Sequence, residues 1–155
     1  MDRLSIRRYK REDSAAVLEL HKSGLEETES YINDKTLDAD LQDIERTYLK
    51  DKGEFLIASI GNEIVGIGAL RRINEETAEI KRMRVSKKHQ AKGIGTLILD
   101  KLIERALKYG YRKLVLDTTA KQTAAQKLYS KRGFKEVKRE KVAGLNCIFY
   151  EIDLE

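Results

Sequence analysis

Residues 79–106, with the sequence EIKRMRVSKKHQAKGIGTLILDKLIERA, strongly limit how this chain can fold. They combine a strand-like stretch, a basic run, two glycines and apolar residues at helical spacing that continue to Ala106. The next apolar run, RKLVLDT at 112–118, is typical of a strand buried on both faces. A helix that joins two strands in this way makes them parallel neighbours. The sequence therefore predicts an α/β crossover at its centre.

The patterns on either side complete the order β-α-α-β-β-β-α-β-α-β-β. Asp13 precedes a helical pattern that we expect to end at Gly24, and a second helix is expected from residue 36 or 37 to Tyr48. Three strand-like runs separated by turn residues then predict an antiparallel meander. The expected strands are 4–10, 54–60, 61–73, 78–85, 112–118, 134–141 and 147–154, and the later helices are 94–109 and 123–131. We expect an α/β fold with a mixed, mostly antiparallel sheet of about seven strands and about four helices.

Length and composition favour one globular domain over residues 1–155. Hydrophobic residues make up 41% and charged residues 37% of the chain, and no proline or repeat marks a boundary. No apolar run is long enough to span a membrane. The first residues lack the pattern of a secretory signal, so we expect a cytoplasmic protein. A lone Cys147 excludes an internal disulfide.

The charges of the chain are unevenly distributed. Six basic residues and no acid lie between Lys81 and Lys92, whereas eight carboxylates and one lysine lie between Glu26 and Glu45. With a net charge of +5, one reading is a basic nucleic-acid-binding module. Aromatic residues that could stack on bases are scarce, at 6% with no tryptophan. A local anion site therefore fits better, and we expect no nucleic acid and no membrane among the partners.

The glycine pair explains what such a local site would bind. The start of a helix leaves backbone N–H groups unpaired and attracts anions, and Gly93 and Gly95 carry no Cβ that would keep a phosphate away. A P-loop needs a Gly-Lys-Ser/Thr ending that is absent. A dinucleotide fingerprint needs a third glycine where Ile98 stands, although Asp117 falls about where its ribose-binding acid belongs. The third candidate is Gln/Arg-x-x-Gly-x-Gly/Ala, here QAKGIG at 90–95.

The stretches AEIKRMRV, QAKGIG, LVLDT and AAQKLYSKRGF, in that order, closely resemble the GNAT superfamily of acyl-CoA-dependent N-acyltransferases. The resemblance covers residues 54–155. It implies the GNAT fold and an N-acetyltransferase that moves the acetyl group of acetyl-CoA to a primary amine by direct attack in a ternary complex. It also implies cofactor-binding roles along the glycine loop for Gln90, Ala91, Lys92, Gly93, Ile94, Gly95 and Thr96.

Further cofactor contacts follow from the same resemblance. Gln122 stands where the family commonly has a pantetheine-contacting asparagine, and Ala125 matches a small-residue position. In the family, strand groups at the positions of Met83, Arg84 and Val85 hold the pantetheine and the thioester oxygen. The apolar residues of this strand change parity after Ile80, as a single bulge would cause. A sheet buried on both faces would produce the same pattern, so both readings stay open here.

Two residues match catalytic positions of the family. Tyr129 corresponds to the general acid that protonates the coenzyme A thiolate, and its alternative role is packing against Phe134. Glu79 corresponds to a general base, which would have to act through water because about 13 Å of strand separates it from Met83. Its alternative role is a salt bridge to Lys81 or Arg72.

The expected partners are acetyl-CoA, an amine acceptor and, as a further option, a second copy of the chain in a homodimer. The acidic stretch 26–45 either flanks the acceptor entrance, which would favour a cationic amine, or is a solvated helix face. His21 and His89 lack a second ligand at metal spacing, so no metal is expected. Cys147 is expected to be a small buried side chain. A non-catalytic acyl-CoA sensor remains the alternative to an enzyme.

Overall fold

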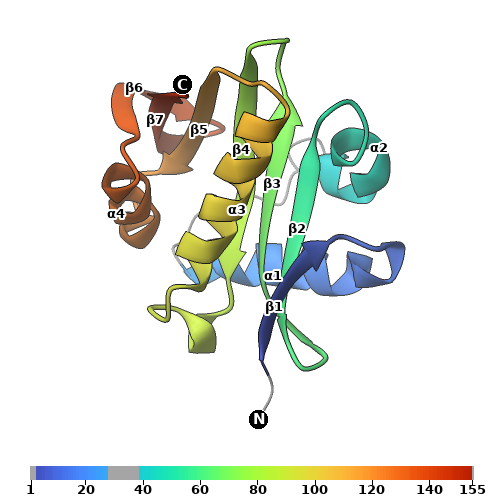
Figure 1. The fold of residues 1–155 in the computed structure, drawn as a ribbon. Coiled ribbons are helices and arrows are strands. Elements are labelled where there is room, and N and C mark those ends of the chain that lie inside the picture. Colours follow the sequence, from blue (N-terminus) through green and yellow to red (C-terminus); the bar gives the residue numbers. More distant parts are fainter. Residues whose placement is uncertain (1–2, 28–38, 155) are drawn as a thin grey trace.

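The computed structural model describes residues 3–27 and 39–154, and within them seven strands form one sheet (Figure 1). Their order is β1-β2-β3-β4-β5-β7-β6, and β4 with β5 is the one parallel pair in the described residues. The expected mixed, mostly antiparallel sheet is confirmed. The strands are β1 (Leu4–Arg8), β2 (Glu54–Ile60), β3 (Glu63–Arg72), β4 (Thr77–Val85), β5 (Lys113–Thr119), β6 (Lys135–Val142) and β7 (Leu145–Asp153).

Four helices in the described residues lie on the two faces of the sheet, and they confirm the expected order of elements. Figure 1 shows α3 in front of the central strands and α1 behind them. The helices are α1 (Ser14–Glu27), α2 (Ile44–Tyr48), α3 (Ile94–Lys108) and α4 (Thr123–Lys131). Short 3₁₀ turns occur at η1 (Arg11–Asp13), η2 (Ala39–Gln42) and η3 (Lys87–His89).

Two hydrophobic clusters hold these helices to the sheet. One lies beneath α3 and α4 and includes Ile98, Leu102 and Tyr129, and the other lies beneath α1 and α2 and includes Val17 and Tyr48. Burial of apolar side chains on both faces supplies the main driving force for this arrangement. Because the central strands are covered on both sides, they read in the sequence as nearly continuous apolar runs.

Gly68 allows α3 to lie close against β3. A Cβ at this position would come within 2.5 Å of the Ile98 side chain and 2.7 Å of the Met83 sulfur. Real Cβ atoms do not approach neighbours so closely, and both contacts belong to the packed core. The glycines of the GIG sequence in β3 therefore serve helix packing.

Two predicted helix boundaries are wrong. The first helix continues past Gly24 to Glu27, because Gly24 gives room for Arg84 instead of ending the helix: a Cβ there would lie 2.8 Å from Arg84 Cδ. The second helix is interrupted at Asp43, whose side chain accepts a hydrogen bond from the backbone N–H of Arg46 and caps a new helix. The start expected for that helix at residue 36 or 37 lies outside the described residues.

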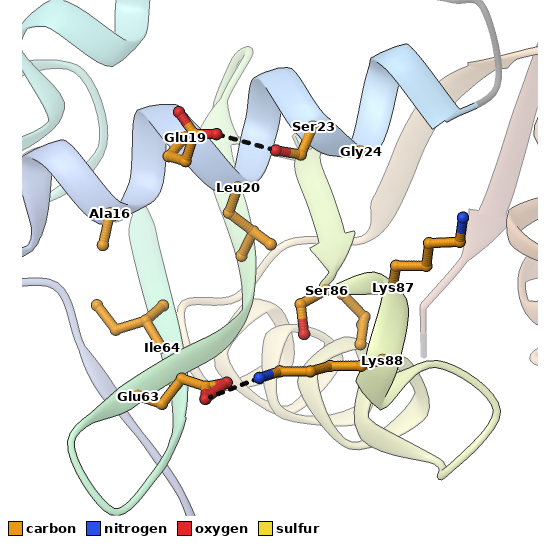
Figure 2. Close-up of a pocket in the computed structure, with 11 residues that line it drawn as sticks. Ala16, Glu19, Leu20, Ser23, Gly24, Glu63, Ile64, Ser86, Lys87 and Lys88 are labelled. Carbon is orange, nitrogen blue, oxygen red and sulfur yellow. Dashed lines mark hydrogen bonds and ion pairs between the residues drawn. The ribbon is translucent and has the colours of Figure 1, made fainter.

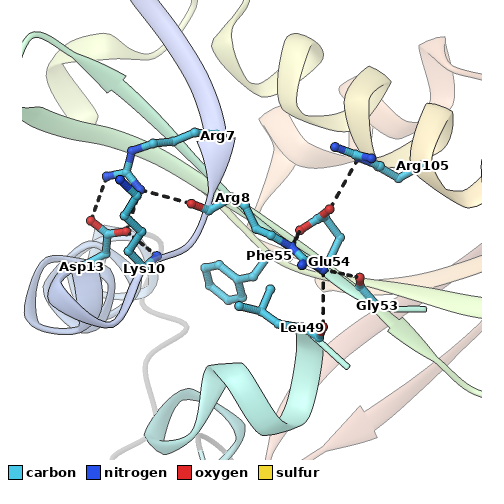
Figure 3. A network of polar contacts seen from close by, with 9 residues as sticks. All are labelled: Arg7, Arg8, Lys10, Asp13, Leu49, Gly53, Glu54, Phe55 and Arg105. Atoms are coloured by element: carbon cyan, nitrogen blue, oxygen red, sulfur yellow. Dashed lines mark hydrogen bonds and ion pairs between the residues drawn. The ribbon is translucent and has the colours of Figure 1, made fainter. Parts of the chain in front are cut away.

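A buried carboxylate, Glu54, joins the edge of the sheet to α3 (Figure 3). Arg8 of β1 donates to it across 2.8 Å, and Arg105 of α3 lies 3.4 Å away. The backbone N–H of Phe55 donates a third contact at 3.1 Å. The Glu54 side chain is 1% exposed, so these partners compensate for the cost of burying its charge.

No helix within the described part of the chain is both long enough and apolar enough to cross a membrane.

Candidate active site

The two central strands separate after a short parallel pairing. Residues Thr77–Glu79 of β4 pair with Lys113–Val115 of β5, and the pairing of the two strands ends there. Beyond this point β4 remains paired with β3, and β5 remains paired with β7 as far as Thr119. An opening therefore lies between β4 and β5 in the middle of the sheet.

A bulge in β4 adjoins the opening. Ile67 of β3 pairs with Arg84 and Ala69 pairs with Lys81, so two steps along β3 match three steps along β4. Arg82 lies in this bulge with φ +60, a conformation that is unusual for a residue with a side chain. The bulge predicted from the change of parity after Ile80 is confirmed.

The bulge is anchored to the helices behind the sheet. Arg82 donates to both carboxylate oxygens of Asp40, at 2.9 Å and 2.5 Å, and lies 3.5 Å from the ring of His21. The Tyr48 hydroxyl also donates to Asp40. Burial opposes ionisation of Asp40, but the Arg82 guanidinium outweighs it and holds the pKa of the carboxyl below its usual value. One of the six basic residues thus serves the fold instead of a ligand.

The glycine loop places the start of α3 beside the opening. Gly93 is the N-cap of the helix with φ +83, and a Cβ there would meet open space. Ile94, Gly95 and Thr96 form the first turn, whose backbone N–H groups have no acceptor within the helix. With the helix dipole, this arrangement favours an anion such as a phosphate.

One cleft of about 570 Å³ brings together most of the predicted site residues. Lys92 is the one predicted cofactor residue that does not line it, and Glu79 also lies outside its lining. The predicted residues that line the cleft are Met83, Arg84, Val85, Gln90, Ala91, Gly93, Ile94, Gly95, Thr96, Gln122, Ala125 and Tyr129.

The sequence analysis missed the other residues of this cleft. Lys121, Lys127 and Lys131 bring positive charge from α4 and the loop before it, and Thr123, Ala124 and Leu128 complete that wall. The residues at 124, 127, 128 and 131 recur at helical spacing along one face of α4, so the pattern itself could have identified them. Gly24 of α1 and His89 also line the cleft, and only the tertiary fold brings them there.

Side chains already occupy two backbone carbonyls of β4, although a bulge at Met83, Arg84 and Val85 would be expected to leave such groups free for the cofactor. The Arg84 guanidinium donates to the carbonyl of Met83 at 2.6 Å, and the Gln90 amide donates to the carbonyl of Val85 at 3.0 Å. Gln122 accepts hydrogen bonds from Thr118 and Thr119, which fixes the end of β5 to the start of α4. The expectation of open carbonyls on β4 is thus wrong for two of them, and a ligand there would displace flexible side chains.

Tyr129 packs against neighbouring rings, as one of its two expected roles requires, and also lines the cleft; its role as general acid stays a prediction. Its ring packs edge-on against Phe134, with centroids 5.9 Å apart, and lies 6.1 Å from the ring of Tyr150, while the residue still lines the cleft. Burial raises the pKa of Tyr129 to about 12; Arg84 opposes this shift, and the charge of Asp117 adds to it. The phenol therefore carries its proton at neutral pH, and burial makes it a weaker acid than an exposed tyrosine.

Glu79 forms an ion pair with a residue that the sequence analysis did not consider. Arg71, its neighbour across the β3–β4 pairing, donates to it at 3.0 Å. The expected partners, Lys81 and Arg72, are therefore wrong, and Arg72 instead pairs with Asp51. The Glu79 side chain is 16% exposed and is tied into the sheet.

The described acids of the stretch 26–45 mostly have structural partners. Asp40 binds Arg82, Asp43 caps α2, and Glu45 accepts from Arg11 at 2.8 Å. Asp38 lies outside the described residues. Because these three carboxylates are bound within the protein, they do not support the hypothesis that the acidic stretch forms the entrance for a cationic acceptor.

A second cavity, of about 790 Å³, lies beneath α1 (Figure 2). Gly24 and Val85 line both cavities, so the two meet at these residues. Figure 2 shows the Lys88 side chain reaching Glu63 at one side of this cavity, across 3.4 Å. Lys88 is therefore the second residue of the basic run, after Arg82, whose charge is paired within the protein.

The remaining candidates have simple environments. The His89 ring lies 2.7 Å from the Ser86 hydroxyl. Cys147 is 6% exposed and burial raises the pKa of its thiol, which fits a small buried side chain. Within residues 3–27 and 39–154, no group of three or more His, Cys, Asp or Glu residues is arranged to hold a metal ion.

Comparison with known proteins identifies relatives along most of the chain. A sequence profile described as the acetyltransferase (GNAT) family matches residues 16–134. The N-acetylaspartate synthetase of Xenopus tropicalis is 40% identical over 103 residues, which cover 65% of this chain and 38% of that protein. The human protein of that name is 39% identical over 65% of this chain and 34% of its own length. This chain therefore spans little more than a third of these relatives.

Solved structures share the whole fold. An acetyltransferase of the GNAT family from Staphylococcus aureus Mu50 has a TM-score of 0.90 and 29% identity, with 99% of this chain and 100% of that chain covered. A GNAT family acetyltransferase from Elizabethkingia anophelis with acetyl-CoA bound has a TM-score of 0.73 and 24% identity, with 99% and 100% covered. At that identity the second likeness concerns the fold alone.

Proposed function

Because this chain belongs to the acetyltransferase (GNAT) family, we propose that it transfers the acetyl group of acetyl-CoA to a primary amine by direct attack in a ternary complex. One observation carries the proposal. The opening between β4 and β5, the glycine-started helix α3 and the buried phenol of Tyr129 meet at a single cleft. Thioester aminolysis needs such a combination of an anion site, a slot for an extended arm and a proton donor.

The cofactor would bind along the lining of this cleft. Its pyrophosphate would lie on the first turn of α3, held by backbone N–H groups from Gly93 to Thr96, with Gln90 and Ala91 beside it. Lys92 would contribute charge from outside the lining, together with Lys121 and Lys127 within it. The pantetheine would follow β4 from Val85 to Met83, with Gln122 and Ala125 on the opposite wall.

In the proposed reaction, the neutral amine attacks the thioester carbonyl carbon and forms a carbon–nitrogen bond. The tetrahedral oxyanion then collapses, and the carbon–sulfur bond breaks with its electron pair on sulfur. Tyr129 gives its proton to the departing thiolate. Burial alone would make this phenol a weaker acid, and the nearby Arg84 charge, which lowers its pKa, favours release of the proton.

Charges near the opening favour an acceptor that carries both an amine and a carboxylate. The Asp117 carboxylate lies within electrostatic reach of the Glu79 carboxylate and of the basic side chains of Lys81 and Arg84. Such a mixed field suits a zwitterion better than a polycation. The relatives above are named for N-acetylaspartate, whose parent amine has this character. The cationic amine expected from the sequence is the alternative.

The proposal is tested by measuring thiol release from acetyl-CoA with L-aspartate, spermidine or Nα-acetyl-L-lysine as acceptor. A melting experiment comes first, because ligand at 100 times its Kd should add about 2.7 kcal/mol to the free energy of unfolding. No rise in melting temperature at millimolar acetyl-CoA would contradict the proposal. A rise without thiol release for any of the three amines would favour the non-catalytic sensor.

A further inference from the structure

Asp117 lies on β5 just beyond the end of its pairing with β4, on the face of the sheet opposite to Tyr129, and it lines neither of the two cavities. It follows Val115, the last residue of β5 paired with β4, by two positions and therefore shares its face. Leu114 and Leu116, which alternate with Val115 and Asp117, belong to the cluster beneath α3 and α4 that includes Tyr129. Tyr129 and Asp117 thus approach the gap between the strands from its two sides.

The groups around Asp117 come from three elements. The Asp117 carboxylate interacts electrostatically with four charged residues of β4, namely Glu79, Lys81, Arg82 and Arg84. It also interacts electrostatically with Tyr129 of α4 and Cys147 of β7. Phe149 of β7 is its direct neighbour in the sheet.

The other acids near the opening are engaged. Glu79 holds Arg71 at 3.0 Å, and Asp40 holds Arg82. The Asp117 side chain has no hydrogen bond or ion pair among residues 3–27 and 39–154, and the residue as a whole is exposed at the surface. It is therefore the carboxylate beside the gap that is available to a ligand.

We propose that Asp117 is the general base of the reaction: its carboxylate receives the acceptor's ammonium group and removes the proton that prevents attack. This inference rests on the proposed function. It reassigns the role that the resemblance gave to Glu79, which is bound within the sheet and separated from the bulge.

The protons balance in two transfers. An ammonium group that becomes an amide nitrogen loses two protons. The first passes to Asp117 before attack and then to solvent. The second leaves the nitrogen as the tetrahedral intermediate collapses, and it replaces the proton that Tyr129 has given to the thiolate. No oxidant, metal or further reactant is needed.

The titration behaviour of Asp117 supports this role. Although the residue as a whole is exposed, partial desolvation of its carboxyl raises the pKa above the usual value, and the charge of Glu79 adds to the shift, while Lys81, Arg82 and Arg84 oppose it. A base is most effective when its pKa approaches the working pH. The same shift predicts that ionised Asp117 lowers the stability of the folded protein at neutral pH.

The test compares Asp117→Asn with Glu79→Gln, a matched change of the neighbouring carboxylate on the same face. With the most active of the three amines above, Asp117→Asn should lower kcat about 100-fold. It should leave the Kd for acetyl-CoA within about two-fold and remove the acidic limb of the pH–rate profile. Its melting temperature should rise, whereas Glu79→Gln should change kcat by less than about five-fold. Asp117→Glu should recover part of the activity.

Several results would overturn the inference. A kcat of Asp117→Asn within about three-fold of wild type, with an unchanged pH profile, would exclude the base. A lower melting temperature or weaker acetyl-CoA binding would assign Asp117 to structure or to cofactor binding. If the wild-type protein binds acetyl-CoA but acetylates none of the three amines, the result contradicts the proposed function and, with it, the assignment of Asp117 as general base. That outcome is recognised without any variant.

Discussion

The Arg82 guanidinium donates hydrogen bonds to both carboxylate oxygens of Asp40, 42 positions earlier in the chain, and thereby fixes the bulge of β4. Each of the two side chains is 11% exposed. Arg82 also adopts a positive φ, which a residue with a side chain keeps only when its surroundings hold it. The shape of the strand beside the opening thus depends on a contact with the segment before α2.

Asp40→Asn should destabilise the protein and reduce activity together. Removing one partner of a buried ion pair leaves the other charge uncompensated, so the free energy of unfolding should fall by about 3 kcal/mol in urea titrations. Glu136→Gln, which breaks the exposed contact with Arg139, is the control and should leave the unfolding midpoint unchanged. A loss below about 1 kcal/mol for Asp40→Asn would contradict the anchoring role.

Gly93→Ala should weaken acetyl-CoA binding, and Gly110→Ala should not. Both glycines have a positive φ, +83 and +87, and in both cases a Cβ would meet open space in the protein. Each change should therefore cost about 1 kcal/mol of stability from backbone strain. Only Gly93 lines the cleft, so its methyl group should raise the Kd for acetyl-CoA about ten-fold, measured by calorimetry. Equal Kd values for the two variants would remove the glycine loop from the cofactor site.

Tyr129→Phe should separate chemistry from packing. The ring contacts with Phe134 and Tyr150 survive the change, so folding and acetyl-CoA affinity should be preserved. Loss of the acid should lower kcat about 100-fold, as measured by thiol release in steady state. Tyr109→Phe makes the same chemical change outside the cleft lining and serves as control. Full activity in Tyr129→Phe would leave the phenol with a packing role alone.

Stability should fall at acidic pH because of two paired aspartates. Arg7 lowers the pKa of Asp13 through its hydrogen bonds, and Arg82 lowers the pKa of Asp40 against the effect of burial. A carboxyl with a lowered folded-state pKa contributes stability above its unfolded pKa, about 3.9, and this is lost as the pH falls through the folded value. Urea midpoints should be flat near neutral pH and drop below about pH 4. Asp13→Asn should make that drop smaller, and an unchanged curve would argue against its contribution.

Local patterns in the sequence were enough to predict the element order and the glycine loop. Periods of two and of about 3.6 residues distinguish strands from helices, and the parity change after Ile80 indicates the bulge. These signals depend only on residues close together in the chain. The resemblance to the GNAT superfamily, and not these local patterns, pointed to Tyr129 and to the cleft residues on β4 and α4.

Contacts between distant segments could not be predicted in this way. The pairing of Arg82 with Asp40 depends on where η2 packs, and the ion pair of Glu79 with Arg71 depends on the register of β3 and β4. Asp117 was noted only as the acid of a dinucleotide motif, because its position becomes meaningful once β4 and β5 are known to separate.

The short pairing between β4 and β5 also has a mechanical consequence. In the described chain, three residue pairs, with the hydrogen bonds from Arg112 and Lys113 to the Glu76 carbonyl beside them, join a half-sheet of four strands to one of three. Such a narrow seam should let the halves rock against each other, and amide hydrogens beside it should exchange with solvent faster than those of β2 and β3. A pantetheine arm lying in the gap would act as a temporary strand, so the bound substrate would itself stiffen the sheet on which it reacts.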